Sequence, residues 1–152
     1  MGQYYYIVNL DKRQFLHPHK LGDGLKLLEF GCSHNTMVCL AVLLADGNGR
    51  GGGDLHSKNP LVGSWAGDRI VIAGDYADKG RFVPEGLTGD GDDPLTLYKL
   101  AGASYEDISW AIAEAACDDT YIRQSFLDAY WSEDLVPPFL RAEWFEKHTT
   151  HK

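Results

Sequence analysis

Positive charge is scarce in this sequence. Its 152 residues include 14 Lys and Arg against 22 Asp and Glu, which gives a formal net charge of -8. The cations form no basic run, so the phosphates of a nucleic acid would repel the chain rather than attract it. We therefore expect no direct contact with nucleic acid, and the acidic balance favours solubility.

Long apolar runs are absent too. The longest spans nine residues, Met37 to Ala45, whereas a membrane-spanning helix needs roughly 20. The first residues, MGQYYYIVNLDKR, lack the cationic start, apolar core and small-residue cleavage site of a secretory signal. Tyr6 also stands where the myristoylation pattern requires Ser or Thr. These absences predict a cytoplasmic protein with no membrane attachment.

Cysteine is limited to three residues, which cannot all pair within one chain. Cys39 and Cys117 stand among apolar residues, a setting typical of core thiols. Cys32 stands in a polar stretch and is the most plausible reactive thiol of the three. This usage predicts a reducing compartment.

Several catalytic and phosphate-binding motifs are missing as well. The sequence has no Gly-Lys-Ser/Thr of a Walker loop and no Gly-x-Ser-x-Gly of a serine hydrolase. His34 follows Cys32 closely, but a cysteine–histidine dyad is built in space, so sequence proximity does not predict one. The sequence therefore identifies no nucleophile.

A dense glycine segment is the most unusual feature that is present. The stretch DGNGRGGGD, residues 46–54, holds five glycines in nine residues. Its Gly-x-Gly-x-x-Gly pattern matches the dinucleotide fingerprint, but the residues that follow contain Pro60 and no helical period, and the fingerprint needs a helix there. A calcium loop is excluded because Arg50 would occupy a ligand position.

A less standard anion site remains open. Closely spaced glycines permit positive φ angles, so that successive amides can converge on an anion, and an arginine can add a bidentate contact. We expect a small anionic ligand, such as a nucleotide or a phosphate ester, to bind at this loop. The alternative is a mobile connector, which is the commoner role of such loops. The predicted ligand-binding residues are Arg50, Gly51, Gly52, Gly53, Asp54, Trp65, Asp68 and Arg69.

Two histidines one residue apart, His17 and His19, form the second candidate site. In extended chain they point to the same side, a spacing that metal ligands use. A metal-assisted hydrolase, in which the metal activates water, is therefore a second hypothesis. The alternative is a pair of histidines at a strand end, one of them bonded to backbone. The predicted metal ligands are His17, His19, Asp23 and His34, with Cys32, Asp54 and His56 as further choices.

Hydrophobic patterning predicts strands in the first half of the chain and helices in the second. Residues 3–10 and 14–17 form a hairpin whose first strand is central because both of its faces are apolar. A second hairpin joins strands 69–76 and 81–83. The predicted helices cover 25–30, 36–45, 93–101, a segment after 104 that Asp118-Asp119 interrupts, and 137–144. We predict one α+β domain over residues 1–152, with an antiparallel or mixed sheet packed against C-terminal helices.

Polar residues at helix starts predict the caps. Asp23 caps the helix at 25–30, and Asp93 caps the helix at 93–101. Ser104 and Asp107 form a capping box for the next helix. Ser33 or Asn35 starts the helix at 36–45, where a buried strand is the alternative because an all-apolar run has no diagnostic period.

Four segments in order resemble a family of small uncharacterised proteins from bacteria and their viruses. They are MGQYYYIVNLDKR, HPHKLGDGLKLLEFGCS, GNGRGGGDL and VGSWAGDRIVIAGDYADKGRF, and they span roughly the first ninety residues. The resemblance implies no activity, because none is assigned to the family. It does show that the polar turns belong to the pattern as much as the apolar strands.

A third hypothesis is an interaction or self-assembling module. In that case the aromatic residues of the C-terminal helices would face a partner or a second copy of the chain. The sequence identifies no cofactor and does not decide whether the protein is an enzyme.

Overall fold

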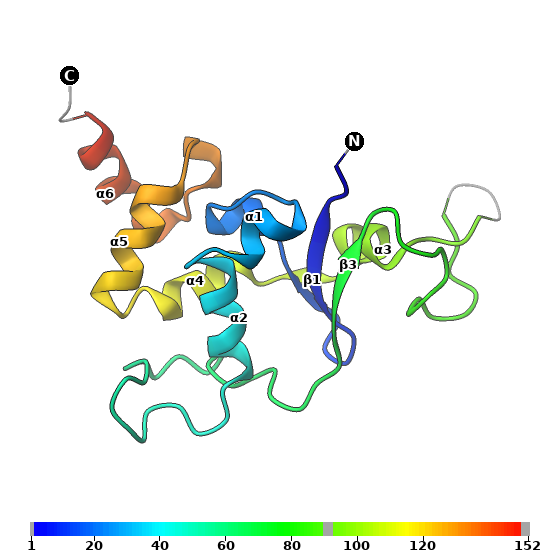
Figure 1. Ribbon diagram of the computed structural model, residues 1–152, viewed down its shortest axis with the longest axis horizontal. Helices are drawn as coiled ribbons and strands as arrows, with labels where there is room; N and C mark the ends of the chain where they lie inside the picture. Colours follow the sequence, from blue (N-terminus) through cyan, green and yellow to red (C-terminus); the bar gives the residue numbers. More distant parts are fainter. Residues whose placement is uncertain (1, 90–92, 150–152) are drawn as a thin grey trace.

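The structure is a computed structural model that describes residues 2–89 and 93–149 (Figure 1). These residues form four strands and six helices, with two short 3-10 turns. The strands are β1 (Tyr5–Asn9), β2 (Gln14–Leu16), β3 (Ile70–Gly74) and β4 (Glu106–Asp107). The helices are α1 (Leu27–Gly31), α2 (Thr36–Leu44), α3 (Leu97–Ser104), α4 (Ser109–Ala116), α5 (Thr120–Ala129) and α6 (Pro138–Thr149), and the 3-10 turns are η1 (Pro18–Leu21) and η2 (Glu133–Leu135).

The sheet is mixed, with the strand order β3-β1-β2-β4. Strand β1 is antiparallel to both neighbours, and its Ile7 lies opposite Leu16 of β2 and Ile72 of β3. The short strand β4 runs parallel to β2. The predicted α+β class and the central place of the first strand are therefore confirmed.

Alternate residues of β1 enter two different cores, because successive side chains of a strand point to opposite faces. Ile7 packs in the larger core with Phe30, Leu43 and Ile112 from the helices. Val8 packs on the other face, in a smaller core that includes Ala101 of α3. Figure 1 shows α3 on one side of the sheet and α1, α2, α4 and α5 on the other. Ile7 and Val8, one on each face, are both fully buried because both faces of β1 are covered.

The helix α2 begins and ends close to the prediction, but Asp23 does not cap the helix for which it was predicted. Helix α1 begins later, after Lys26. The carboxylate of Asp23 instead accepts hydrogen bonds from the backbone nitrogen of Thr36 at 3.0 Å, from the Thr36 hydroxyl and from Ser33. Asp23 therefore accepts the hydrogen bonds offered by the first turn of α2, although it lies in a distant segment. No local sequence pattern predicts such a contact.

The predicted second hairpin is wrong. Residues 81–83 form turns instead of a strand, and β3 pairs with β1. The amide of Gly80 donates to the carbonyl of Leu95 at 2.8 Å, which directs the chain away from β3. Phe82 takes a left-handed φ of 61°, and Pro84 has no amide hydrogen, so this segment cannot continue a ladder.

Two predicted helix starts after residue 90 are also wrong. Thr96, not Asp93, caps α3 by accepting a hydrogen bond from the nitrogen of Lys99 at 3.2 Å. Ser104 ends α3, and β4 separates that helix from α4. Asp107 accepts hydrogen bonds from the nitrogen and hydroxyl of Ser109 at 2.9 and 2.6 Å. The starts of the last two helices agree with the prediction, because Asp119 caps α5 and a proline begins α6.

Two of the three cysteines are core thiols, as predicted. Cys39 and Cys117 are buried, and Cys32 is exposed. Burial raises the pKa of Cys117 to about 12 and holds the pKa of Cys39 well above its ordinary value. Within the described residues, no helix has both the length and the apolar character needed to cross a membrane.

Candidate functional site

The glycine loop forms an anion nest, and its own Asp54 fills that nest. One carboxylate oxygen of Asp54 accepts hydrogen bonds from the backbone nitrogens of Gly49, Arg50 and Gly51 at 2.9, 3.0 and 3.0 Å. Those three bonds lower the pKa of Asp54 below its ordinary value. Convergent amides of this kind bind anions, and here the anion is part of the chain.

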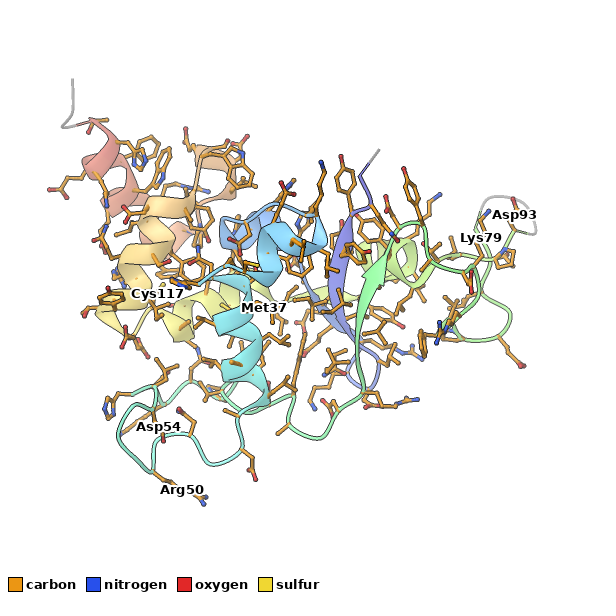
Figure 2. All side chains as sticks on the ribbon, in the orientation of Figure 1. Met37, Arg50, Asp54, Lys79, Asp93 and Cys117 are labelled. Carbon is orange, nitrogen blue, oxygen red and sulfur yellow. The ribbon has the colours of Figure 1, made fainter. Side chains whose placement is uncertain are left out.

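The loop is closed by a second set of contacts. The side chain of Asn48 donates to the carbonyl of Leu55 at 2.8 Å and accepts from the nitrogen of Leu55 at 2.9 Å. Arg50 is exposed, and Figure 2 shows its side chain at the outer tip of the loop. The glycine segment is thus an ordered turn with its arginine directed outward.

A pocket of about 320 Å³ lies between this loop, α2 and the start of α5. Its floor is apolar, with Val38 and Ile122 among the lining residues. Among the described residues, the charged members of its lining are Asp54 and Asp119, and none is Lys or Arg. A small anion would meet negative charge here, so the pocket does not complement the expected ligand.

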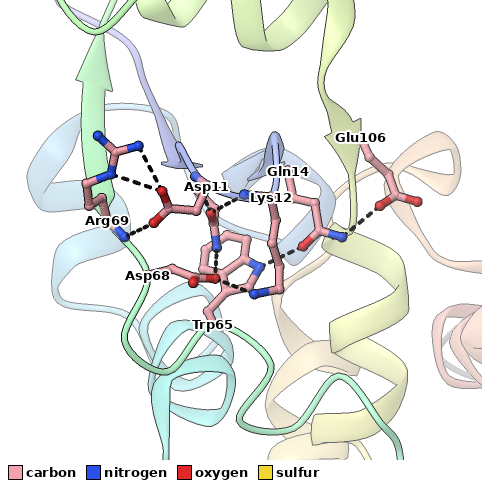
Figure 3. Close-up of polar contacts among 8 residues, drawn as sticks. Asp11, Lys12, Gln14, Trp65, Asp68, Arg69 and Glu106 are labelled. Carbon is pink, nitrogen blue, oxygen red and sulfur yellow. Dashed lines mark hydrogen bonds and ion pairs between the residues drawn. The ribbon is translucent and has the colours of Figure 1, made fainter.

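Trp65, Asp68 and Arg69 lie at a different place, where the chain enters β3. Figure 3 shows them against the turn that joins β1 to β2. Trp65 is fully buried, and its indole nitrogen donates to the side-chain oxygen of Gln14 at 2.8 Å. Gln14 in turn donates to Glu106 at 2.8 Å. Trp65 therefore serves the core and offers no surface to a ligand.

The charges of Asp68 and Arg69 are paired within the chain. Asp68 accepts hydrogen bonds from Asn9 at 2.8 Å and from Lys12 at 2.6 Å. Arg69 donates from its Nε and Nη2 atoms to Asp11 at 3.0 and 2.8 Å (Figure 3). These hydrogen bonds lower the pKa of both aspartates. The network ties the β1–β2 turn to the start of β3.

The four predicted metal ligands are not brought together. The rings of His17 and His19 lie 5.5 Å apart, while Asp23 is bonded to the start of α2 and His34 is exposed. In the described parts of the chain, no three His, Cys, Asp or Glu residues are grouped so as to hold a metal ion. His19 contacts the ring of Trp131 at 5.3 Å, so aromatic packing surrounds the pair.

His17 has a specific environment that the sequence did not indicate. Its ring lies 4.9 Å from the ring of Tyr6, and its Nδ1 atom is buried without a hydrogen-bond partner among the described residues. Burial lowers the pKa of His17 to about 4, against the smaller opposing effect of Asp107. Its backbone nitrogen donates to the hydroxyl of Ser109 at 2.7 Å. His17 is therefore a neutral packing residue near pH 7.

A second pocket of about 320 Å³, which no sequence pattern indicated, is lined by two arginines. It lies between the β1–β2 turn and the segment 82–84. Arg81 lies next to it, with its guanidinium 4.8 Å from the ring centre of Phe82. We call it the arginine pocket; its lining residues are Leu10, Arg13, Arg69, Phe82, Val83, Pro84 and Tyr105.

Backbone strain is concentrated at the arginine pocket. Among the described residues, Arg13 and Phe82 are the two non-glycine residues with positive φ, at 54° and 61°, and both line it. A left-handed conformation costs a residue with a side chain roughly 1–2 kcal/mol, and such strain clusters at functional sites. The sequence indicates a short turn between β1 and β2, which contains Arg13. It does not indicate the positive φ angle of Arg13, because backbone angles of non-glycine residues cannot be read from sequence.

Arg13 is also the arginine with the least internal pairing at this pocket. Arg69 forms an ion pair with Asp11. The guanidinium of Arg13, by contrast, forms no ion pair and no side-chain hydrogen bond within residues 2–89 and 93–149. An adjoining hollow of about 240 Å³ shares Arg13, Pro84 and Tyr105 with the arginine pocket. The arrangement can accept a small group with negative charge and a short apolar portion.

Comparison with known proteins identifies no family. No family model matches the chain, and no solved structure matches it. A formate-dependent phosphoribosylglycinamide formyltransferase of Janthinobacterium sp. (strain Marseille) is 28% identical over 83 residues. The match covers 55% of this chain, which spans about a fifth (20%) of that protein. The resemblance to small bacterial and viral proteins stays a prediction.

Proposed function

We propose that this protein binds a small anionic ligand, a phosphate ester or a nucleotide-like molecule, in the arginine pocket. The observation that carries the proposal is the position of Arg13, a strained arginine whose side chain has no partner among the described residues, beside Arg69 in a pocket of about 320 Å³. Guanidinium groups bind phosphate and carboxylate through paired hydrogen bonds.

The strain supports a role for the Arg13 side chain rather than for the turn alone. Glycine would satisfy a φ of 54° without steric cost, yet this position carries an arginine whose side chain forms no hydrogen bond or ion pair within residues 2–89 and 93–149. A residue that destabilises its own backbone is consistent with a function at that position.

The glycine loop supports the proposal less well. Asp54 already occupies the converging amides, so an incoming anion would have to displace an intramolecular carboxylate. The adjoining pocket adds Asp119 to that negative charge. We therefore place the ligand at the arginine pocket and treat the loop as a closed structural turn.

The comparison adds one chemical clue. The phosphoribosylglycinamide in the relative's name is a phosphate ester, which is the chemistry that two arginines would bind. The activity named there is not transferred, because the match covers a fifth of that protein. We also expect the protein to work in a reducing cytoplasm, where its three free cysteines would persist.

Thermal denaturation with added ligand tests the proposal. The probes are inorganic phosphate, a nucleoside monophosphate and citrate, each titrated against the wild-type chain. A ligand at a hundred times its Kd stabilises the folded state by about 2.7 kcal/mol, which raises the Tm by roughly 5–10 °C for a domain of this size. The absence of any shift with all three probes would overturn the proposal.

Variants locate the site. Arg13→Gly removes the guanidinium and relieves the left-handed backbone, so it should abolish the ligand-dependent shift while the ligand-free Tm stays equal or rises. The matched control is Arg50→Ala, which removes an exposed arginine from the glycine loop and should leave the shift intact. Loss of the shift in Arg50→Ala with retention in Arg13→Gly would return the site to the glycine loop.

A further inference from the structure

In the part of the chain that the structure describes, strand β3 leaves one edge of the sheet without a partner. It is the terminal strand of the order β3-β1-β2-β4 and pairs with β1 alone. Proteins usually protect such an edge with lysine, proline or a bulge. The sequence of β3, IVIAG, contains no charge and no proline.

The backbone groups that face outward are defined by the ladder with β1. Leu10 donates to the carbonyl of Arg69, and Asp75 donates to the carbonyl of Tyr4, so odd-numbered residues from 69 to 75 face β1. Alternation then directs the amides and carbonyls of Ile70, Ile72 and Gly74 to the free edge. The Ile72 side chain is 41% exposed at this edge.

We infer that this edge pairs with the same edge of a second copy of the chain, antiparallel and centred on Ile72. In that register each Ile72 lies opposite the other Ile72, and each Ile70 lies opposite Gly74 of the second copy. The outward backbone amides and carbonyls of one copy then lie opposite those of the other copy, which a continuous antiparallel ladder requires. Gly74 is buried in one copy, and its carbonyl accepts a hydrogen bond from Ala77 at 3.2 Å, so its pairing with Ile70 of the second copy requires this turn to move aside.

Flanking charges favour this register over others. Arg69 and Asp75 are each three residues from Ile72, through which the two-fold axis of the dimer passes. Arg69 of each copy therefore lies opposite Asp75 of the other, which gives two such pairs. The Nη1 atom of Arg69 is not used by Asp11, and one carboxylate oxygen of Asp75 is not used by Tyr4. A symmetric dimer interface has this kind of self-complementarity, whereas a shift by two residues would lose both pairs.

The ladder extends the sheet from four strands to eight across the two copies. An interface of five residues per copy is small, so we expect a dissociation constant in the micromolar range. The exposed Tyr76, 61% accessible, lies at the end of the edge and adds apolar area to the contact. The interface shares Arg69 with the arginine pocket, whereas Arg13, which carries the proposed ligand contact, takes no part in it.

Sedimentation equilibrium over a wide concentration range tests the dimer. The wild-type chain should pass from 16.9 kDa to twice that mass as its concentration rises. Ile72→Pro should stay at 16.9 kDa, because it removes an outward amide that the β1–β3 ladder does not use. The matched control Ile72→Thr keeps the amide and a β-branched side chain, so it should dimerise like the wild type.

Two results would overturn the inference: a wild-type chain that stays monomeric up to roughly 500 µM, well above micromolar Kd values, or an Ile72→Pro variant that dimerises normally. A second readout tests the register. In a Cys32→Ser background, Ile72→Cys should form cross-linked dimers with a short bis-maleimide, while Tyr121→Cys, on the exposed face of α5, should not. Equal cross-linking of both cysteines would contradict the proposed edge.

Discussion

The indole nitrogen of Trp65 donates a hydrogen bond of 2.8 Å to the side-chain oxygen of Gln14. The two residues are separated by 51 positions, and the bond joins the segment before β3 to strand β2. Trp65 also donates its backbone amide to the carbonyl of Leu43 in α2. Trp65 therefore links helix α2, strand β2 and the segment that leads into the edge strand β3.

Replacing Trp65 by Phe should lower the free energy of unfolding by about 2 kcal/mol, because it leaves a cavity and removes the donor to Gln14. Urea denaturation followed by circular dichroism measures the change. The control is Trp131→Phe, at a residue that is 56% exposed, which should change stability by less than about 0.5 kcal/mol. Equal effects of the two substitutions would contradict the central role of Trp65.

Asp54→Ala should open the glycine loop without unfolding the domain. The amides of Gly49, Arg50 and Gly51 lose their common acceptor, so hydrogen exchange at these positions should accelerate. The control Asp46→Ala changes a neighbouring carboxylate outside the nest and should leave their exchange rates unchanged. Unaltered protection in Asp54→Ala would mean that the carboxylate does not hold the loop.

Asp23→Ala should destabilise the fold through the start of α2. The substitution removes the acceptor of the Thr36 amide and of two hydroxyls, with an expected cost of about 1–2 kcal/mol. Asp23→Asn retains an acceptor oxygen and should cost less. Chemical denaturation of the three proteins tests this order, and a wild-type midpoint for Asp23→Ala would refute the capping role.

The stability of the protein should fall as the pH falls from 6.5 to 4, in part because of His17. Burial lowers its pKa in the folded state to about 4, whereas the unfolded chain titrates near 6.5. Between these values the unfolded state takes up a proton that the folded state does not bind, so protonation favours unfolding. Each pKa unit corresponds to about 1.4 kcal/mol, which gives a loss of about 3 kcal/mol at pH 4.

The variant His17→Phe isolates this contribution. Phenylalanine retains the contact with the ring of Tyr6 and cannot titrate, and the unbonded Nδ1 atom makes the substitution tolerable. Denaturant unfolding at pH 7, 5.5 and 4 should show a shallower decline for the variant than for the wild type. Parallel declines would mean that other groups cause the pH dependence.

Local patterns predicted the elements whose signals lie within a few residues. The apolar strand β1, the helix α2 and the proline at the start of α6 follow from hydrophobic runs and cap residues. The predictions failed where the partner is distant. Gly80 bonds Leu95 instead of closing a second hairpin, and Asp23 caps a helix thirteen residues away.

For the candidate site, too, some features were predictable from local sequence and others were not. The sequence by itself determined that glycines 47–53 could form a nest of amides, because positive φ angles are a local property of glycine. Only the tertiary structure decided that Asp54 fills the nest and that Arg13 lies beside Arg69. The Asp54 contacts span three to five residues and depend on how the loop reverses direction. The approach of Arg13 to Arg69 depends on the pairing of β1 with β3, and contacts between segments far apart in sequence leave no periodic signal within either segment.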